Sequence, residues 1–163
     1  MKRFYPNSLP FFSNEPTPEM FEIRRISASA GEGVVSKSYF LEGDIVCGFT
    51  GYLVNSITQF SLTLAPNLHI HDPYFMGKIL HSCDPNLFCD MKTRTFIAKR
   101  DIGPGEIITM DYAQTEPKLF RLFECCCGAP NCRGFITGYR ERKQPVESCL
   151  SLCGTSAKGA GAC

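Results

Sequence analysis

Two cysteine-bearing stretches hold most of the reactive side chains in this sequence. The first, residues 78–86, places a histidine, a cysteine, a proline-fixed turn and an asparagine close together. The second carries Cys125, Cys127 and Cys132 on a loop rich in glycine, proline and asparagine. Structural zinc is commonly bound by four cysteine thiolates in a tetrahedron. Three such residues in one loop therefore indicate a metal site that takes its fourth ligand from elsewhere in the chain.

The residues alone leave this fourth ligand open. The candidates are the other cysteines, namely Cys126, Cys83, Cys89, Cys47 and those of the C-terminal tail. Cys126 stands between two proposed ligands, so its side chain should diverge from theirs. Free buried thiols are the simpler alternative, but the close clustering of the three cysteines favours a metal.

Composition limits the class of protein. A chain of 163 residues suits one domain with a sizeable core. Its formal charge of +1 gives no overall field that would point to direct nucleic-acid binding or to an anionic membrane. Residues 4–18 contain four prolines and no apolar signal-peptide core, and no apolar run reaches the roughly 20 residues that span a bilayer. We therefore expect an intracellular protein, cytoplasmic or, in a eukaryote, nuclear.

The ten cysteines are expected to be reduced. An even count also fits a secreted protein held by disulfides, but no secretion signal accompanies it. Such a protein would resist chelators and hold no free thiols. The adjacent cysteines at 125–127 suit thiolate coordination better than separate bridges.

Short strands and turns should position these residues, since the chain has 14 glycines, 11 prolines and many Phe, Tyr, Ile and Val. The expected strands are 21–26, 34–36, 45–49, 60–64, 68–70, 87–91, 94–99 and 107–112. Short helices are expected at 74–80 and 117–123. Gly31 and Gly33 predict a hairpin turn when taken alone. His69 and His71 are interpreted as ordinary polar positions.

Four motifs, taken together, resemble those of the SET-domain protein lysine methyltransferases that carry a cysteine-rich post-SET segment. Gly-Glu-Gly-Val-Val-Ser at 31–36 is similar to the first glycine motif of that family. His-Ser-Cys-Asp-Pro-Asn at 81–86 and Gly-Glu-Ile-Ile-Thr-Met-Asp-Tyr at 105–112 resemble its two central motifs. The segment 125–134 resembles its post-SET loop. The resemblance covers about 21–139, with the motifs in the family's order.

The resemblance implies a mainly β SET fold of several small β-sheets, with few short helices, a C-terminal pseudoknot and a zinc-bound post-SET loop. The expected divisions are an N-terminal arm (1–20), the SET domain (21–116), the post-SET segment (117–140) and a disordered tail (141–163). The implied reaction moves a methyl group from S-adenosylmethionine to a lysine ε-amine of a protein, for example a histone tail. The target would be recognised by the domain itself or through a homo-oligomer, without a membrane.

The resemblance also assigns roles to individual residues. Zinc would be held by Cys83, Cys125, Cys127 and Cys132. The catalytic residue would be Tyr112. The cofactor would be bound by Glu32, Gly33, Val34, Tyr39, Leu80, His81, Tyr112 and Phe123. The lysine channel would be lined by Phe60 and Met110, and Asn86 would hold the knot through side-chain hydrogen bonds.

Two positions depart from the family pattern. Leu80 stands where asparagine is usual, which removes a polar contact to the cofactor. It is the one feature that supports an alternative, a non-catalytic, zinc-stabilised SET-like protein-binding module. Met110 stands where Phe or Tyr is usual, and a tyrosine there restricts the product to monomethyl-lysine. Methionine has no hydroxyl and is flexible, so we hypothesise that di- or trimethylation occurs.

Overall fold

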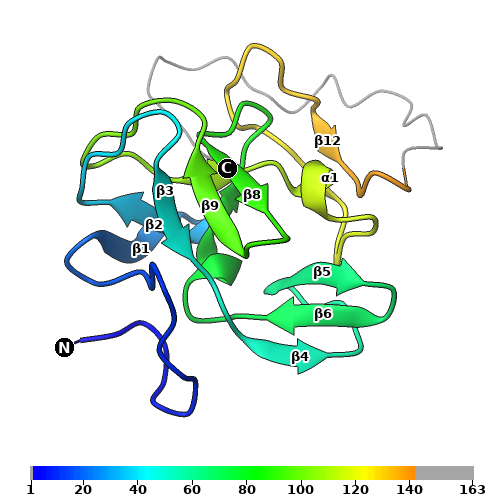
Figure 1. The fold of residues 1–163 in the computed structure, drawn as a ribbon. Coiled ribbons are helices and arrows are strands. Elements are labelled where there is room, and N and C mark those ends of the chain that lie inside the picture. Colours follow the sequence, from blue (N-terminus) through cyan, green and yellow to red (C-terminus); the bar gives the residue numbers. More distant parts are fainter. Residues whose placement is uncertain (1, 142–163) are drawn as a thin grey trace.

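Short β-strands in five small sheets dominate the part of the chain that this computed structural model describes, residues 2–141 (Figure 1). Two sheets are three-stranded, with the orders β3–β9–β8 and β4–β6–β5, and the pairs β1–β2, β7–β10 and β11–β12 form the others. The elements are β1 (Phe21–Ser27), β2 (Gly31–Ser36), β3 (Ile45–Gly48), β4 (Tyr52–Val54), β5 (Ser61–Ala65), β6 (Leu68–His71), the 3-10 helix η1 (Met76–Lys78), β7 (Leu80–His81), β8 (Leu87–Asp90), β9 (Thr95–Ala98), β10 (Thr109–Met110), α1 (Tyr112–Thr115), β11 (Phe123–Glu124) and β12 (Phe135–Ile136). The mainly β fold expected from the composition is confirmed. The tail expected at 141–163 lies outside the described residues, apart from Glu141.

The β1–β2 hairpin forms as the glycine spacing predicts. Its two strands are antiparallel, and Gly31 adopts a φ of +75° at the start of β2. This is the left-handed region, which glycine enters at little cost because it has no Cβ. β2 runs from the exposed Glu32 into buried residues, 33–36.

The core consists of a large cluster and a small one. The large cluster packs the apolar faces of the main sheets, with Phe21, Phe75 and Phe96 almost fully buried. Burial of one such side chain stabilises the fold by about 1.5–3 kcal/mol. The small cluster includes Leu119 and Ile136 together with the cysteines of the C-terminal loop. The ring of Tyr112 packs against both clusters, so this residue lies where the C-terminal segment meets the main body.

A parallel pairing brings the two central motifs together. β10 pairs with β7, and Thr109 and Met110 lie opposite Leu80 and His81. Asn86 is 1% exposed; its amide donates to the Ile107 carbonyl at 3.0 Å and its oxygen accepts from the Thr109 N–H at 2.8 Å. The prediction that Asn86 holds this junction by side-chain hydrogen bonds is confirmed.

The N-terminal arm has no regular element in residues 2–20, as predicted, and it packs against the core. Tyr5 and Leu9 are buried, and the Tyr5 hydroxyl donates to the Asp72 carboxylate at 2.6 Å. The same carboxylate accepts from three backbone N–H groups at the start of η1, those of residues 74–76. The arm therefore helps to fix the segment that leads into β7.

The two helix predictions have different outcomes. At 74–80 the helix is limited to η1, because the parallel pairing with β10 draws Leu80 into a strand. At 117–123 no helix forms, and Phe123 begins β11. Helix α1 lies earlier and begins at Tyr112, the last residue of the strand expected at 107–112. The Asp111 side chain accepts from the Ala113 N–H at 3.0 Å, which caps a helix start and ends the strand.

Candidate functional site

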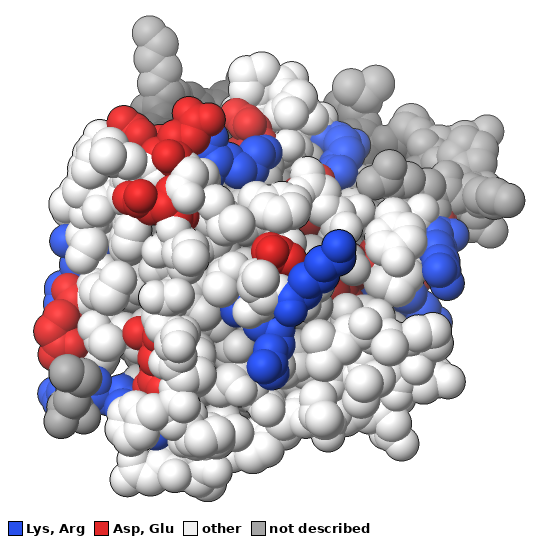
Figure 2. Space-filling model, in the orientation of Figure 1, with Lys and Arg blue, Asp and Glu red and all other residues white. Residues whose placement is uncertain are grey.

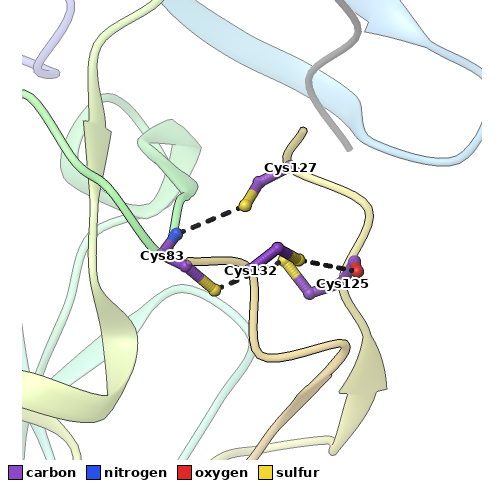
Figure 3. Close-up of side chains that lie close together, drawn as sticks. All are labelled: Cys83, Cys125, Cys127 and Cys132. Atoms are coloured by element: carbon purple, nitrogen blue, oxygen red, sulfur yellow. Dashed lines mark hydrogen bonds between the residues drawn. The ribbon is translucent and has the colours of Figure 1, made fainter. Parts of the chain in front are cut away.

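Four cysteines from two distant parts of the chain meet at one point (Figure 3). Cys83 follows β7, whereas Cys125, Cys127 and Cys132 lie on the loop between β11 and β12. Their Sγ atoms all lie within 4.8 Å of one another, and those of Cys83 and Cys125 are 3.9 Å apart. Zinc–sulfur bonds of about 2.3 Å in a tetrahedron require sulfurs about 3.8 Å apart. The four thiols therefore fit a tetrahedral zinc ion, and Cys126 is outside the group, as predicted.

Backbone and side-chain donors stabilise the cysteine cluster. The Cys83 N–H donates to Sγ of Cys127 at 3.5 Å, and the Arg133 N–H donates to Sγ of Cys83 at 3.3 Å. Burial opposes ionisation of Cys127, but the donor from Cys83 and its neighbours lower the pKa of this thiol to about 6. The Asn131 side chain donates to the Cys83 carbonyl at 3.2 Å. Burial raises the pKa of Cys83 and of Cys125, so Cys127 is the thiol of these three whose ionisation the cluster favours.

A pocket of about 540 Å³ lies beside the cluster, a size that suits a small-molecule ligand. It is lined from several elements: β2, η1, β7, β10, α1, β11 and the start of β5 all contribute. Of the residues to which the sequence assigns cofactor or channel roles, those that line it are Glu32, Phe60, Leu80, His81, Met110, Tyr112 and Phe123. The fold thus gathers seven residues spread over more than half of the chain.

Tyr112 occupies the centre of this arrangement. It is the first residue of α1 and lines the pocket, and its hydroxyl donates to the Ile79 carbonyl at 2.8 Å. Burial raises the pKa of Tyr112 well above its ordinary value. The phenol therefore stays protonated at neutral pH and is a hydrogen-bonding group, not a base.

His81 connects the pocket to the cluster. Its ring lies 5.2 Å from that of Tyr112 and 5.6 Å from that of Phe123, and Nδ1 accepts from the Tyr112 N–H at 3.3 Å. Burial, aided by the nearby Arg133 charge, lowers the pKa of His81 to about 4. The neutral His81 imidazole therefore packs against the rings of Tyr112 and Phe123, accepts a hydrogen bond and forms part of the pocket wall.

Three predicted cofactor residues lie outside the pocket lining. Gly33 has no room for a side chain, because a Cβ there would lie 2.9 Å from Cδ1 of Leu80. Val34 is fully buried in the core. Tyr39 is 59% exposed, and its hydroxyl donates to the Asp101 carboxylate at 3.0 Å.

Sequence reasoning missed two charged residues of the site. Arg133 forms two hydrogen bonds to the Asp111 carboxylate, at 2.5 and 3.1 Å, which joins the C-terminal loop to the start of α1. The sequence feature that could have indicated Arg133 is its position directly after the proposed metal ligand Cys132. Glu116 lines the pocket and accepts from the N–H and hydroxyl of Thr63 at 2.7–3.2 Å. No local sequence pattern indicates that Glu116 belongs to the site.

The surface carries charges of both signs. Figure 2 shows acidic and basic side chains scattered on one face, with uncharged surface between them. This agrees with the net charge of +1. No helix in the described residues is long and apolar enough to cross a membrane.

Known proteins resemble this chain in sequence and fold. Methyltransferase flvH of Aspergillus flavus is 33% identical over 93 residues, which covers 56% of this chain and 52% of the relative. Histone-lysine N-methyltransferase ash1 of Drosophila melanogaster is 30% identical over 155 residues, which covers 76% of this chain and 7% of the relative. The chain thus spans about half or less of the length of these relatives.

A solved structure gives the same result for the fold. The crystal structure of KRYPTONITE in complex with mCHG DNA and SAH superposes with a TM-score of 0.59 at 28% identity, covering 71% of this chain and 28% of that one. The family model of the SET domain matches residues 31–113, about half of the chain and the part that supplies most of the pocket wall. On this match, together with the fold and the cysteine cluster, the chain belongs to the SET-domain family.

Proposed function

We propose that this chain transfers a methyl group from S-adenosylmethionine to the ε-amine of a lysine in a protein. The observation that carries the proposal is the position of Tyr112. Its hydroxyl is held by the Ile79 carbonyl in a pocket bordered by His81, Met110 and Phe123. Such a phenol can orient an amine without taking up charge itself. The SAH bound in the KRYPTONITE structures supports the choice of cofactor.

The pocket residues fit a cofactor that has both an aromatic base and a polar chain. Phe123 and His81 supply ring faces and edges, and Leu80 an apolar wall. Glu32 and the glycine turn before it supply polar atoms at another part of the lining. When bound, S-adenosylmethionine supplies a methyl group on a positively charged sulfur.

The target amine must be neutral to react. At pH 7, neutralising a lysine with a reference pKa near 10.4 costs about 4–5 kcal/mol. The buried Met110 and the half-buried Tyr112 would lower the pKa of that amine by desolvation. The Tyr112 hydroxyl would then fix the direction of its lone pair, since alignment of the reacting groups supplies much of the rate.

Met110 supports more than one round of transfer. This residue is 2% exposed and lines the pocket, where its flexible thioether leaves no hydroxyl to hold a water against a methylated amine. We expect di- or trimethyl-lysine among the products. Mass spectrometry that finds only monomethyl-lysine from both the wild type and Met110→Tyr would contradict this.

Zinc would give the pocket one of its walls. The four cysteines at 83, 125, 127 and 132 would hold it, and the loop that carries three of them runs on from β11, whose Phe123 lines the pocket. In this proposal the metal is structural, because all four positions of the tetrahedron are filled by protein ligands.

A histone is the first substrate to test. The relatives include proteins named as histone H3 lysine-36 and lysine-4 methyltransferases, and one KRYPTONITE structure contains an H3(1–15) peptide. A nuclear location would follow from such a substrate. Whether the chain acts as a homo-oligomer, and the expectation that it does not bind nucleic acid directly, stay predictions.

The decisive experiment is methyl transfer from radiolabelled S-adenosylmethionine to histones and to cell lysate. We expect incorporation by the wild type, and a loss on the order of 10²-fold for Tyr112→Phe, as for removal of one preorganised hydrogen-bonding group. Wild-type activity that Tyr112→Phe leaves unchanged would refute the assigned role.

Leu80 favours a second candidate, the non-catalytic binding module, because it places an apolar side chain where a polar contact to the cofactor is expected. Calorimetry with S-adenosylmethionine separates the two. Tight binding that depends on zinc supports the enzyme, and absence of binding to the zinc-loaded protein supports the module.

A further inference from the structure

Two opposite charges meet in the wall of the pocket. Glu32 lies on β2 and Lys78 at the end of η1, and the Lys78 ammonium approaches the Glu32 carboxylate at 2.5 Å. Both residues line the pocket. The pair therefore joins two elements across the same cavity that we propose for the cofactor.

The two partners differ in how firmly they are held. The Lys78 side chain is 20% exposed, and its ammonium lies 5.3 Å from the centre of the Phe60 ring. The Glu32 side chain is 55% exposed, and its hydrogen bond to Lys78 lowers the pKa of the carboxyl, so that it is ionised at neutral pH. Ion pairs this accessible to water contribute little to stability. Replacing one partner of the ion pair by a charged group of a ligand therefore costs little free energy.

The pocket lining also carries the charged residues Glu116, Lys118, Arg121 and Glu124, which lie between the end of α1 and the end of β11, away from the glycine turn in the sequence. Leu80 lies next to the glycine turn and fills the space that a side chain at Gly33 would need. It has no hydrogen-bond donor. Lys78, two residues earlier and on the same pocket wall, has three.

We propose that Lys78 and Glu32 bind the amino-acid end of the cofactor, with Lys78 on its carboxylate and Glu32 on its α-ammonium. An amino-acid end carries one charge of each sign, and the ion pair presents the two complementary charges. Each residue exchanges its present partner for a ligand group that carries the same charge as that partner, so no charge is left unpaired. This inference rests on the proposed function, and it gives Lys78 a role that Leu80 cannot fill.

The ion pair also argues against another role for Lys78, in which the enzyme would methylate this lysine itself. An ammonium that donates to a carboxylate has no free lone pair for attack on a methyl group. Methyl-Lys78 in protein incubated with S-adenosylmethionine would overturn the proposal, and mass spectrometry detects it.

The main test is calorimetry of the zinc-loaded protein with two ligands. S-adenosylhomocysteine has the amino-acid end, and 5′-methylthioadenosine has the same adenosine and thioether without it. We expect Lys78→Met to weaken S-adenosylhomocysteine binding about tenfold, as for one charge-assisted hydrogen bond. Glu32→Gln should weaken it less, and neither change should alter binding of 5′-methylthioadenosine. Lys92→Met, on the exposed turn between β8 and β9, is the charge-matched control and should bind both ligands as the wild type does.

A charge-swapped variant separates recognition from stability. Glu32→Lys/Lys78→Glu keeps an ion pair between β2 and η1 but reverses the charges that face the ligand. We expect it to retain the thermal stability of the wild type and to bind S-adenosylhomocysteine weakly. Restored binding in this variant, or equal losses for both ligands in Glu32→Gln and Lys78→Met, would overturn the proposal. A wild type that binds neither ligand would refute the proposed function together with it, whereas wild-type binding with such equal losses would refute this inference alone.

Discussion

Replacement of Asn86 by alanine should loosen the junction between the loop that carries Cys83 and the strand that leads to Tyr112. The residue is 1% exposed, and its side chain donates to the Ile107 carbonyl and accepts from the Thr109 N–H and, at 3.4 Å, from the Thr109 hydroxyl. Each polar group left without a partner costs about 1–3 kcal/mol. Since Ile107 and Thr109 are themselves half-buried, water recovers part of this cost. We expect the free energy of unfolding to fall by about 2–4 kcal/mol.

Urea unfolding in the presence of a fixed zinc concentration measures this loss. Asn55→Ala is the matched control, because Asn55 is exposed in the connection between β4 and β5 and should change stability by less than about 0.5 kcal/mol. A loss of less than about 1 kcal/mol for Asn86→Ala would refute the reasoning, since it would mean that the side-chain hydrogen bonds of Asn86 are not needed to hold the junction.

Two further predictions concern the cysteine cluster and the pocket phenol. Cys127→Ser should abolish stoichiometric zinc binding, whereas Cys126→Ser, which changes a cysteine outside the cluster, should retain it. The zinc content of both variants is measured by metal analysis after dialysis. Equal zinc contents would contradict the assignment of Cys127 as a ligand. Burial raises the pKa of Tyr112, so the folded state keeps its proton when the unfolded chain loses it above about pH 10. The stability from this group is therefore complete below that pH and falls as the pH rises further. Urea unfolding between pH 9 and 11 should show a shallower fall for Tyr112→Phe, and identical slopes would contradict the burial of the hydroxyl.

Local pattern predicted much of the framework. Apolar runs separated by glycine and proline turns located strands that became β1, β3, β5, β6, β8 and β9, because these segments have one face to bury and turn residues at both ends. The cysteine spacing at 125–132 indicated a metal site for the same local reason, since three ligands on one loop are near one another in any fold. The order of the four motifs identified the family, which the comparison with known proteins confirmed.

Tertiary contacts decided the rest of the site. The residue pattern left the fourth cysteine open, and only the family resemblance pointed to Cys83, because its approach to the C-terminal loop depends on the β7–β10 pairing and on Asn86. The same pairing turned Leu80 from the expected helix into a strand. The side chain of Asp111 ended the preceding strand and placed Tyr112 in α1, a choice that propensity at a strand end does not make.

The sequence by itself therefore determined the family motifs, the six strands named above and the three cysteines that lie together, since each depends on residues close to one another in the chain. Only the tertiary structure showed which side chains share the pocket. It placed Tyr39 and Val34 outside the lining and brought Lys78 against Glu32 across 46 residues of chain. Contacts over such separations are fixed by the packing of whole sheets, which no local pattern records.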